Sequence, residues 1–134
     1  MLGRANYPLD FIVACRERAE RQLKLYDALA KKAGKEADAF APEFFNTMVL
    51  ALDHYFMHRL RGKEGKDGNP LNEVRMLATS LLENEGVMTK DNTIKYDPAK
   101  SITGIALGEK IVLDRTQFGA LANGFFGEIA DKFS

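Results

Sequence analysis

The chain has 134 residues, a formal net charge of zero and a hydrophobic fraction of 46%. This length and apolar content allow one buried core and exclude disorder over most of the chain. Balanced charge argues against a strongly basic nucleic-acid-binding protein, and a single cysteine, Cys15, excludes a scaffold of internal disulfides. No apolar run approaches the roughly 20 residues that cross a bilayer, and the first residues lack a signal-peptide pattern, so we expect a cytoplasmic protein without a membrane span.

A first helix is predicted over about residues 8–33. Pro8 suits the first helical position, because the N–H that proline lacks would have no intrahelical partner there. Apolar residues then recur at three- and four-residue spacing, which predicts one buried face. These residues are Ile12, Cys15, Ala19, Leu23, Tyr26 and Ala30. Gly34 is predicted to end the helix, because glycine readily adopts the left-handed conformation.

A second helix is predicted over about residues 42–61, beginning at Pro42 and stopped by Gly62. Its apolar positions cover much of the helix circumference, which indicates a central helix or one that buries a second face in a partner subunit. These positions are Phe44, Phe45, Met48, Val49, Leu50, Leu52, Tyr55, Phe56, Met57 and Leu60.

A third helix is predicted over about residues 70–84, with Asn69 as its cap and Pro70 at its first position. The preceding segment contains three glycines and no apolar side chain, which predicts a connecting turn. We expect this turn to be well ordered, because its many polar groups can satisfy the loop backbone. Asn72 and Glu73, in the first turn of the third helix, are the expected anchors.

A small β-hairpin is predicted over about residues 102–113, and two registers are open. A two-residue turn with Gly108 first suits a type II′ hairpin. A three-residue loop instead places four apolar residues on one face, and the apolar pattern favours this register. The four residues are Ile105, Leu107, Ile111 and Leu113.

The last helix is predicted over about residues 115–133, and it opens with a capping box in which Asp114 is the cap and Gln117 the third residue. Three interior glycines, Gly119, Gly124 and Gly127, indicate close approach of another helix or a ligand. The predicted fold is therefore mainly α: one helical domain over 1–134, with a four-helix core and a small hairpin inserted before the last helix.

A histidine pair suggests one candidate site. His54 and His58 are four residues apart on the predicted second helix, so they share a face and can place two imidazoles on a divalent metal ion. A third ligand would come from Glu73, Asp67 or Glu64. The bland alternative is a pair of exposed histidines that interact favourably with the dipole at a helix end.

The glycine-rich turn suggests a phosphate site, because glycines let backbone N–H groups approach an anion next to a helix N-terminus. Arginine and lysine side chains add positive charge here; they are Arg59, Arg61, Lys63, Lys66 and Arg75. The P-loop pattern fails, however, since Asp67 stands where a serine or threonine should hold magnesium. Nearby acidic residues would also repel phosphate, so a solvated connector is the alternative interpretation.

The segment from His58 to Arg75 reads His-Arg-Leu-Arg-Gly-Lys-Glu-Gly-Lys-Asp-Gly-Asn-Pro-Leu-Asn-Glu-Val-Arg. It resembles the signature of a small uncharacterised bacterial family of mostly helical proteins. The resemblance extends to residues 107–113 and to the last helix. It implies a mostly helical fold and transfers no activity and no catalytic residue.

Two functions follow from these patterns. The first is a non-enzymatic interaction or scaffold module that forms a homodimer and needs no cofactor, as the broadly apolar second helix and the lack of a complete catalytic set indicate. The alternative is a small-ligand or metal-binding protein, or an enzyme, with its site between the second and third helices. The expected site residues are His54, His58, Arg59, Arg61 and Glu73, with the two histidines as metal ligands.

Overall fold

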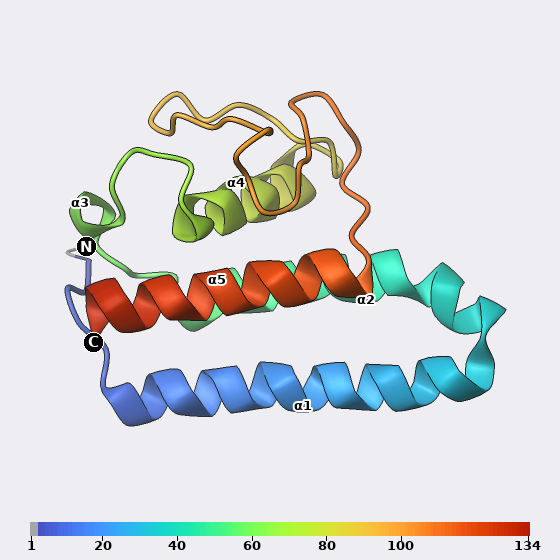
Figure 1. Ribbon diagram of the computed structural model, residues 1–134. Coiled ribbons are helices and arrows are strands. Elements are labelled where there is room, and N and C mark those ends of the chain that lie inside the picture. The colour runs from blue at the N-terminus through green and yellow to red at the C-terminus, as the bar shows by residue number, and fades with distance from the viewer. Residues whose placement is uncertain (1–2) are drawn as a thin grey trace.

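The computed structural model describes residues 3–134, which form a mainly helical protein with five helices (Figure 1). Four are long: α1 (Leu9–Ala33), α2 (Lys35–Tyr55), α4 (Pro70–Glu83) and α5 (Arg115–Phe133). The fifth, α3 (Arg61–Glu64), is a single turn. Within this described part, each helix is either too short or too polar to cross a membrane.

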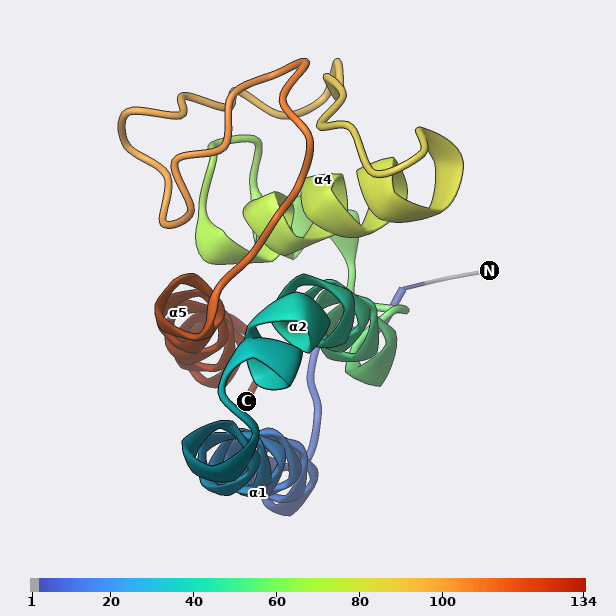
Figure 2. The ribbon, with the colours of Figure 1, turned by 90° about the vertical axis from the view of Figure 1, so that its right-hand side faces the viewer.

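α2 and α5 lie side by side in the middle of the molecule (Figures 1 and 2). α1 covers one side of this pair, and α4 with the irregular segment 84–114 covers the other. The core differs from the expected four-helix core, because the irregular segment also contributes to it. Its buried contributions are Met88, Ile94, Ile105, Ile111 and Leu113.

Three helices begin and end within one residue of the predicted positions, and their caps explain why. Asn69 accepts a hydrogen bond from the backbone N–H of Asn72 at 3.1 Å and so starts α4. Asp114 and Gln117 form the predicted capping box of α5. Gly34, at φ 57°, ends α1 as predicted.

The predicted start of α2 is wrong, because the helix begins at Lys35 and holds Pro42 in its interior. The stretch before the proline is rich in alanine, which has the strongest intrinsic helix propensity. Ala37 and Ala41 are also buried. Packing of these buried alanines therefore offsets the cost of the backbone hydrogen bond that is lost at an interior proline.

The predicted end of α2 is also wrong, because the helix stops at Tyr55 and not before Gly62. Phe56 leaves the helical region, with φ −130° and ψ 38°. The chain beyond it pairs with the N-terminal segment: Arg4 N–H donates to the His58 carbonyl at 2.6 Å, and Leu60 N–H donates to the Arg4 carbonyl at 2.8 Å. This pairing supplies backbone partners that a continued helix would otherwise supply.

The hairpin predicted over 102–113 does not form, and its second half pairs with residues 86–88 instead. Met88 N–H donates to the Glu109 carbonyl at 2.9 Å, and Ile111 N–H donates to the Gly86 carbonyl at 2.8 Å. A turn does form near the expected position, with Gly108 at φ 86°. The first half of the segment does not pair with the second half, because the backbone N–H groups of Ile102 and Thr103 donate to the Glu73 carboxylate.

The glycines of α5 allow a paired stability test. A Cβ at Gly127 meets no atom within 4 Å, so Gly127→Ala is expected to raise the free energy of unfolding by about 0.5–1 kcal/mol. A Cβ at Gly124 lies 3.2 Å from Pro70 Cγ and 2.7 Å from Ile102 Cδ1, so Gly124→Ala is expected to lower it by about 1 kcal/mol. Urea titration of both variants measures the difference, and equal stabilisation by both would contradict the close approach at Gly124.

Candidate functional site

A buried carboxylate, that of Glu64, organises the polar side chains between α2 and α4. It accepts hydrogen bonds from Arg59 Nε at 2.6 Å, from Arg75 Nη2 at 2.6 Å and from Arg61 Nη1 at 3.1 Å. The one-turn helix α3 carries Glu64 inward, and the Glu64 side chain has no exposed surface. Three guanidinium groups therefore converge on one anion.

Arg59 is the most enclosed of the three arginines, with a side chain that has no exposed surface. Besides its bond to Glu64, it donates to Asp53 Oδ1 at 2.9 Å and to the carbonyls of Phe56 and Leu71 at 3.1 and 3.3 Å. Each of its three nitrogen atoms thus has an acceptor. Arg59 thus ties the end of α2 to α3 and α4.

The charge state of Glu64 follows from these neighbours. Burial by itself raises the pKa of the carboxyl group, but the charges and hydrogen bonds of Arg59 and Arg75 outweigh burial and hold the pKa below its ordinary value. Glu64 is therefore ionised at neutral pH. A carboxylate fixed in this state is unsuited to exchange protons with a substrate near neutral pH.

The turn between α3 and α4 is densely hydrogen-bonded. Asn72 Nδ2 donates to the carbonyls of Gly65 and Asp67 at 3.2 and 2.8 Å. Asn69 Nδ2 donates to the Glu64 carbonyl at 2.6 Å. Asn72 anchors the turn as expected, through hydrogen bonds from a buried amide.

Glu73, the second expected anchor, lies elsewhere. Its carboxylate is buried and accepts hydrogen bonds from the backbone N–H groups of Ile102 and Thr103, both at 2.9 Å, and from Thr103 Oγ1 at 2.7 Å. Successive helical residues point about 100° apart, so Asn72 faces the turn while Glu73 faces the irregular segment. Among the described residues, the hydrogen-bond partners of the Glu73 carboxylate are therefore in the irregular segment and not at His54 or His58.

The two histidines are both exposed. His54 lies in the last turn of α2, whereas His58 lies beyond the end of that helix, so the shared helix face expected for them does not exist. Among residues 3–134, no group of three histidine, cysteine, aspartate or glutamate side chains is arranged to hold a metal ion. The geometry of the described residues thus gives the expected histidine metal site no third ligand.

A pocket of about 440 Å³ opens beside the Glu64 network, and we call it the arginine pocket. It brings together three of the expected site residues, His58, Arg59 and Arg61, and adds Arg75. The expected site residues did not include Arg75, but its spacing could have indicated it. Arg75 lies three residues after Asn72 on α4, so both side chains are on the helix face that borders the turn. The full lining is Gly3, Met57, His58, Arg59, Leu60, Arg61 and Arg75.

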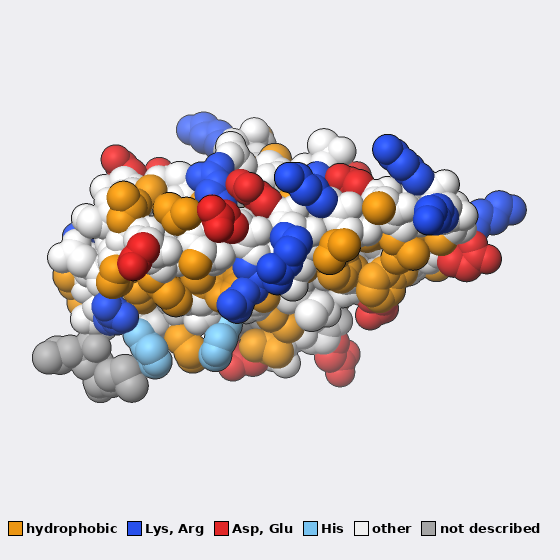
Figure 3. Space-filling model, turned by 90° about the horizontal axis from the view of Figure 1, so that it is seen from below, with side chains coloured by type: hydrophobic (Ala, Val, Ile, Leu, Met, Phe, Trp, Pro, Cys, Tyr) orange, Lys and Arg blue, Asp and Glu red, His pale blue; other side chains and the backbone are white. Residues whose placement is uncertain are grey.

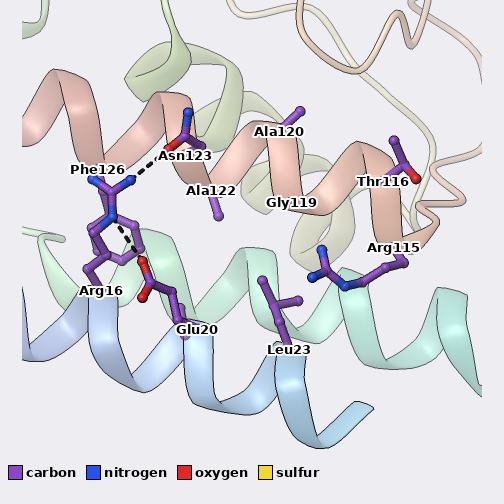
Figure 4. A pocket seen from close by; sticks show the side chains of 11 residues that line it. Arg16, Glu20, Leu23, Arg115, Thr116, Gly119, Ala120, Ala122, Asn123 and Phe126 are labelled. Carbon is purple, nitrogen blue, oxygen red and sulfur yellow. Dashed lines mark hydrogen bonds and ion pairs between the residues drawn. The ribbon is translucent and has the colours of Figure 1, made fainter. Parts of the chain in front are cut away.

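A second hollow of about 440 Å³ lies between α1 and α5 (Figure 4). Its floor is apolar, and its polar rim is internally paired. Arg16 donates to Glu20 Oε1 at 3.2 Å and to Asn123 Oδ1 at 2.6 Å, and Arg115 donates to Asp27 Oδ1 at 2.9 Å. Because these groups already have partners, the rim offers few free polar groups to a ligand.

A third, smaller hollow of about 200 Å³ lies between α1 and α2 near the turn that joins them, and its walls are almost wholly apolar. Leu25, Leu29 and Phe40 stand around it with 64%, 49% and 46% of their surfaces exposed. Figure 3, which views the molecule from the α1 side, shows apolar side chains exposed near this end, among others spread along the same side of the molecule. We call this surface the α1–α2 face; its lining is Gln22, Leu25, Tyr26, Leu29, Phe40 and Phe44.

Comparison of the chain with protein-family models, with curated proteins and with solved structures gives no match.

Proposed function

We propose that the chain is a non-enzymatic cytoplasmic interaction module that works as a homodimer joined through the α1–α2 face. The observation that carries this proposal is the exposure of Leu25, Leu29 and Phe40 around one apolar hollow. Large apolar side chains scattered singly over a surface need no explanation, but a cluster beside a hollow is typical of an interaction site.

A second copy of the chain is the occupant that this face suits. In a twofold-symmetric dimer the same patch serves both partners, so it must supply both the protruding side chains and the cavity that receives them. The α1–α2 face supplies both. Phe40 stacks on Phe44, with ring centroids 5.5 Å apart, and is thereby held as a protruding aromatic group.

The charged borders of the face also favour self-association. Along α1, helical spacing places exposed Arg18, Arg21 and Lys32 beside the apolar stripe. Along α2, the same spacing places exposed Glu36 and Glu43 beside Phe40. When α1 of one copy faces α2 of the other, a basic border meets an acidic border twice, which favours that arrangement over random contacts.

The polar interior supports a non-enzymatic role. The two most deeply buried carboxylates, Glu64 and Glu73, are occupied by structural hydrogen bonds. Cys15 is buried on α1, and burial raises the pKa of its thiol, which suppresses the reactive thiolate. The proposed activity therefore resides in surface recognition.

The oligomeric state tests this proposal. Light scattering on the purified chain at micromolar concentration is expected to give twice the mass of one chain, and Phe40→Asp is expected to give the mass of a single chain, because it places a charge in the apolar contact. Leu82→Asp is the matched control, since Leu82 on α4 is also a large apolar residue, 71% exposed, and lies outside the face. A monomeric wild-type chain would contradict the proposal. So would a Leu82→Asp variant that is as monomeric as Phe40→Asp.

A further inference from the structure

We propose that the arginine pocket binds a small molecule that carries a phosphate group, with Arg75, Arg61 and His58 as the residues that hold the phosphate. The pocket lies at the α3 end of the molecule, opposite the α1–α2 turn (Figure 1), so this inference stands independently of dimerisation.

The composition of the pocket wall supports an anionic ligand. The lining contains three arginines and one histidine, and no acidic side chain among the described residues. Three guanidinium groups share two carboxylates, those of Glu64 and Asp53, which leaves one positive charge in excess in this network. Both carboxylates lie outside the pocket lining, so the wall that a ligand meets is positive.

A third carboxylate, that of Asp91, is close enough to be influenced by the charges of Arg61 and Arg75. Hydrogen bonds from Thr93, at 2.8 Å from its N–H and 2.6 Å from its Oγ1, are the main reason that the pKa of Asp91 lies below its ordinary value. Asp91 does not line the pocket. It therefore does not occupy the place of a ligand there.

Arg75 has unused binding capacity. Its Nη2 donates to Glu64, but its Nε is buried and has no hydrogen-bond partner among the described residues. Because that Nε has no accessible surface, a ligand would be bound by the other N–H groups of the guanidinium, whose side chain is 25% exposed.

The three arginines differ in how much of each side chain a ligand can reach. Arg59 is wholly enclosed and committed to the fold, as shown above. The side chains of Arg61 and Arg75 are 37% and 25% exposed, so each can contact Glu64 on one side and a ligand on the other. Exposed His58 adds a third donor at the rim.

The chemistry and size of the pocket indicate the class of ligand. Guanidinium groups match the oxygen geometry of phosphate and form charge-assisted hydrogen bonds with it. A pocket of about 440 Å³ lies in the range of small-molecule sites and exceeds what a phosphate ion alone would fill. A phosphate monoester of a small organic molecule fits both properties.

Isothermal titration of the full chain at constant ionic strength tests this inference, with inorganic phosphate and glycerol 3-phosphate as probes and chloride as the reference anion. We expect saturable binding of one phosphate group per chain, with the ester bound more tightly than the free ion. Absence of saturable binding of either probe up to about 10 mM would overturn the proposal. Free phosphate bound as tightly as the ester would overturn the assignment of an organic monoester.

Variants locate the binding. Arg75→Gln is expected to weaken ester binding at least about tenfold, because a hydrogen bond to a charged group is worth at least that factor. His58→Ala, an exposed change outside the ion-pair network, is expected to weaken it about threefold and keeps the test valid if Arg75→Gln fails to fold. Lys24→Gln removes one exposed positive charge on α1 as the control. If Lys24→Gln weakened ester binding as much as His58→Ala does, the binding would reflect general charge attraction. That result would overturn the assignment of the ligand to the arginine pocket.

Discussion

Replacing Glu64 by alanine is expected to lower the free energy of unfolding by about 3–5 kcal/mol, the largest loss we expect from any single side chain of this protein. The substitution leaves the guanidinium of Arg59 buried with only part of its charge compensated, and it also removes the acceptor that Arg61 and Arg75 share. Urea denaturation followed by circular dichroism measures the loss. Since small domains are stable by only about 5–15 kcal/mol, much of the chain would unfold at modest temperature.

Glu83→Ala is the control for this experiment, because Glu83 is an exposed glutamate at the end of α4. It is expected to change stability by less than about 0.5 kcal/mol. A loss at Glu64 no larger than that at Glu83 would mean that the three arginines are satisfied by solvent and that the network contributes nothing.

The pH dependence of the free energy of unfolding is a second measurement of the contribution of Glu64. The folded-state pKa of Glu64 lies below its ordinary value of 4.5, so ionised Glu64 stabilises the folded chain above that pH. This contribution is lost as the pH falls from about 4.5 through the lower folded-state pKa. A Glu64→Gln variant is therefore expected to show a weaker decline of stability in acid than the wild-type chain does.

Replacing Glu73 by alanine is expected to cost about 3 kcal/mol and to loosen the irregular segment 84–114. The carboxylate is buried and accepts three hydrogen bonds from Ile102 and Thr103, so its removal leaves backbone N–H groups without acceptors. Hydrogen exchange at the amides of Ile102 and Thr103 is expected to accelerate more than exchange in the middle of α5.

Thr103→Val provides the graded comparison for Glu73, because it removes one of the three hydrogen bonds and keeps the side-chain volume. It is expected to cost about 1 kcal/mol, and the double variant is expected to cost less than the sum of the two single changes. Strict additivity would show that Glu73 stabilises the fold by some route other than its contact with Thr103.

The helices that sequence predicts well are those whose ends carry side-chain signals. Asn69 and Asp114 cap α4 and α5 through contacts with residues three positions away, and such local contacts can be read from the chain. The ends of α2 have no comparable signal. Its start depends on burial of alanines before Pro42, and its end depends on pairing with Arg4, more than 50 residues earlier in the chain.

The candidate site was predictable only in part, for the same reason. The charge cluster between residues 53 and 75 is visible in the sequence, and His58, Arg59 and Arg61 do meet in one pocket. Glu73 does not line that pocket, because one residue of helical rotation separates it from Asn72 and turns its carboxylate toward Ile102 and Thr103. The central place of Glu64 depends on the short helix α3, which composition alone does not predict because its sequence includes Gly62.

The position of α5 has a consequence for how the protein is made. This helix packs against α1, α2 and α4, and its Phe118 and Phe125 lie at the centre of the shared core. During synthesis the three earlier helices leave the ribosome before the element that joins them, with apolar faces such as that of Phe45 still open to water. Completion of the core must therefore wait for residues up to Phe133, and the nascent chain passes through an interval in which chaperones, or another nascent copy, compete with α5 for the same surfaces.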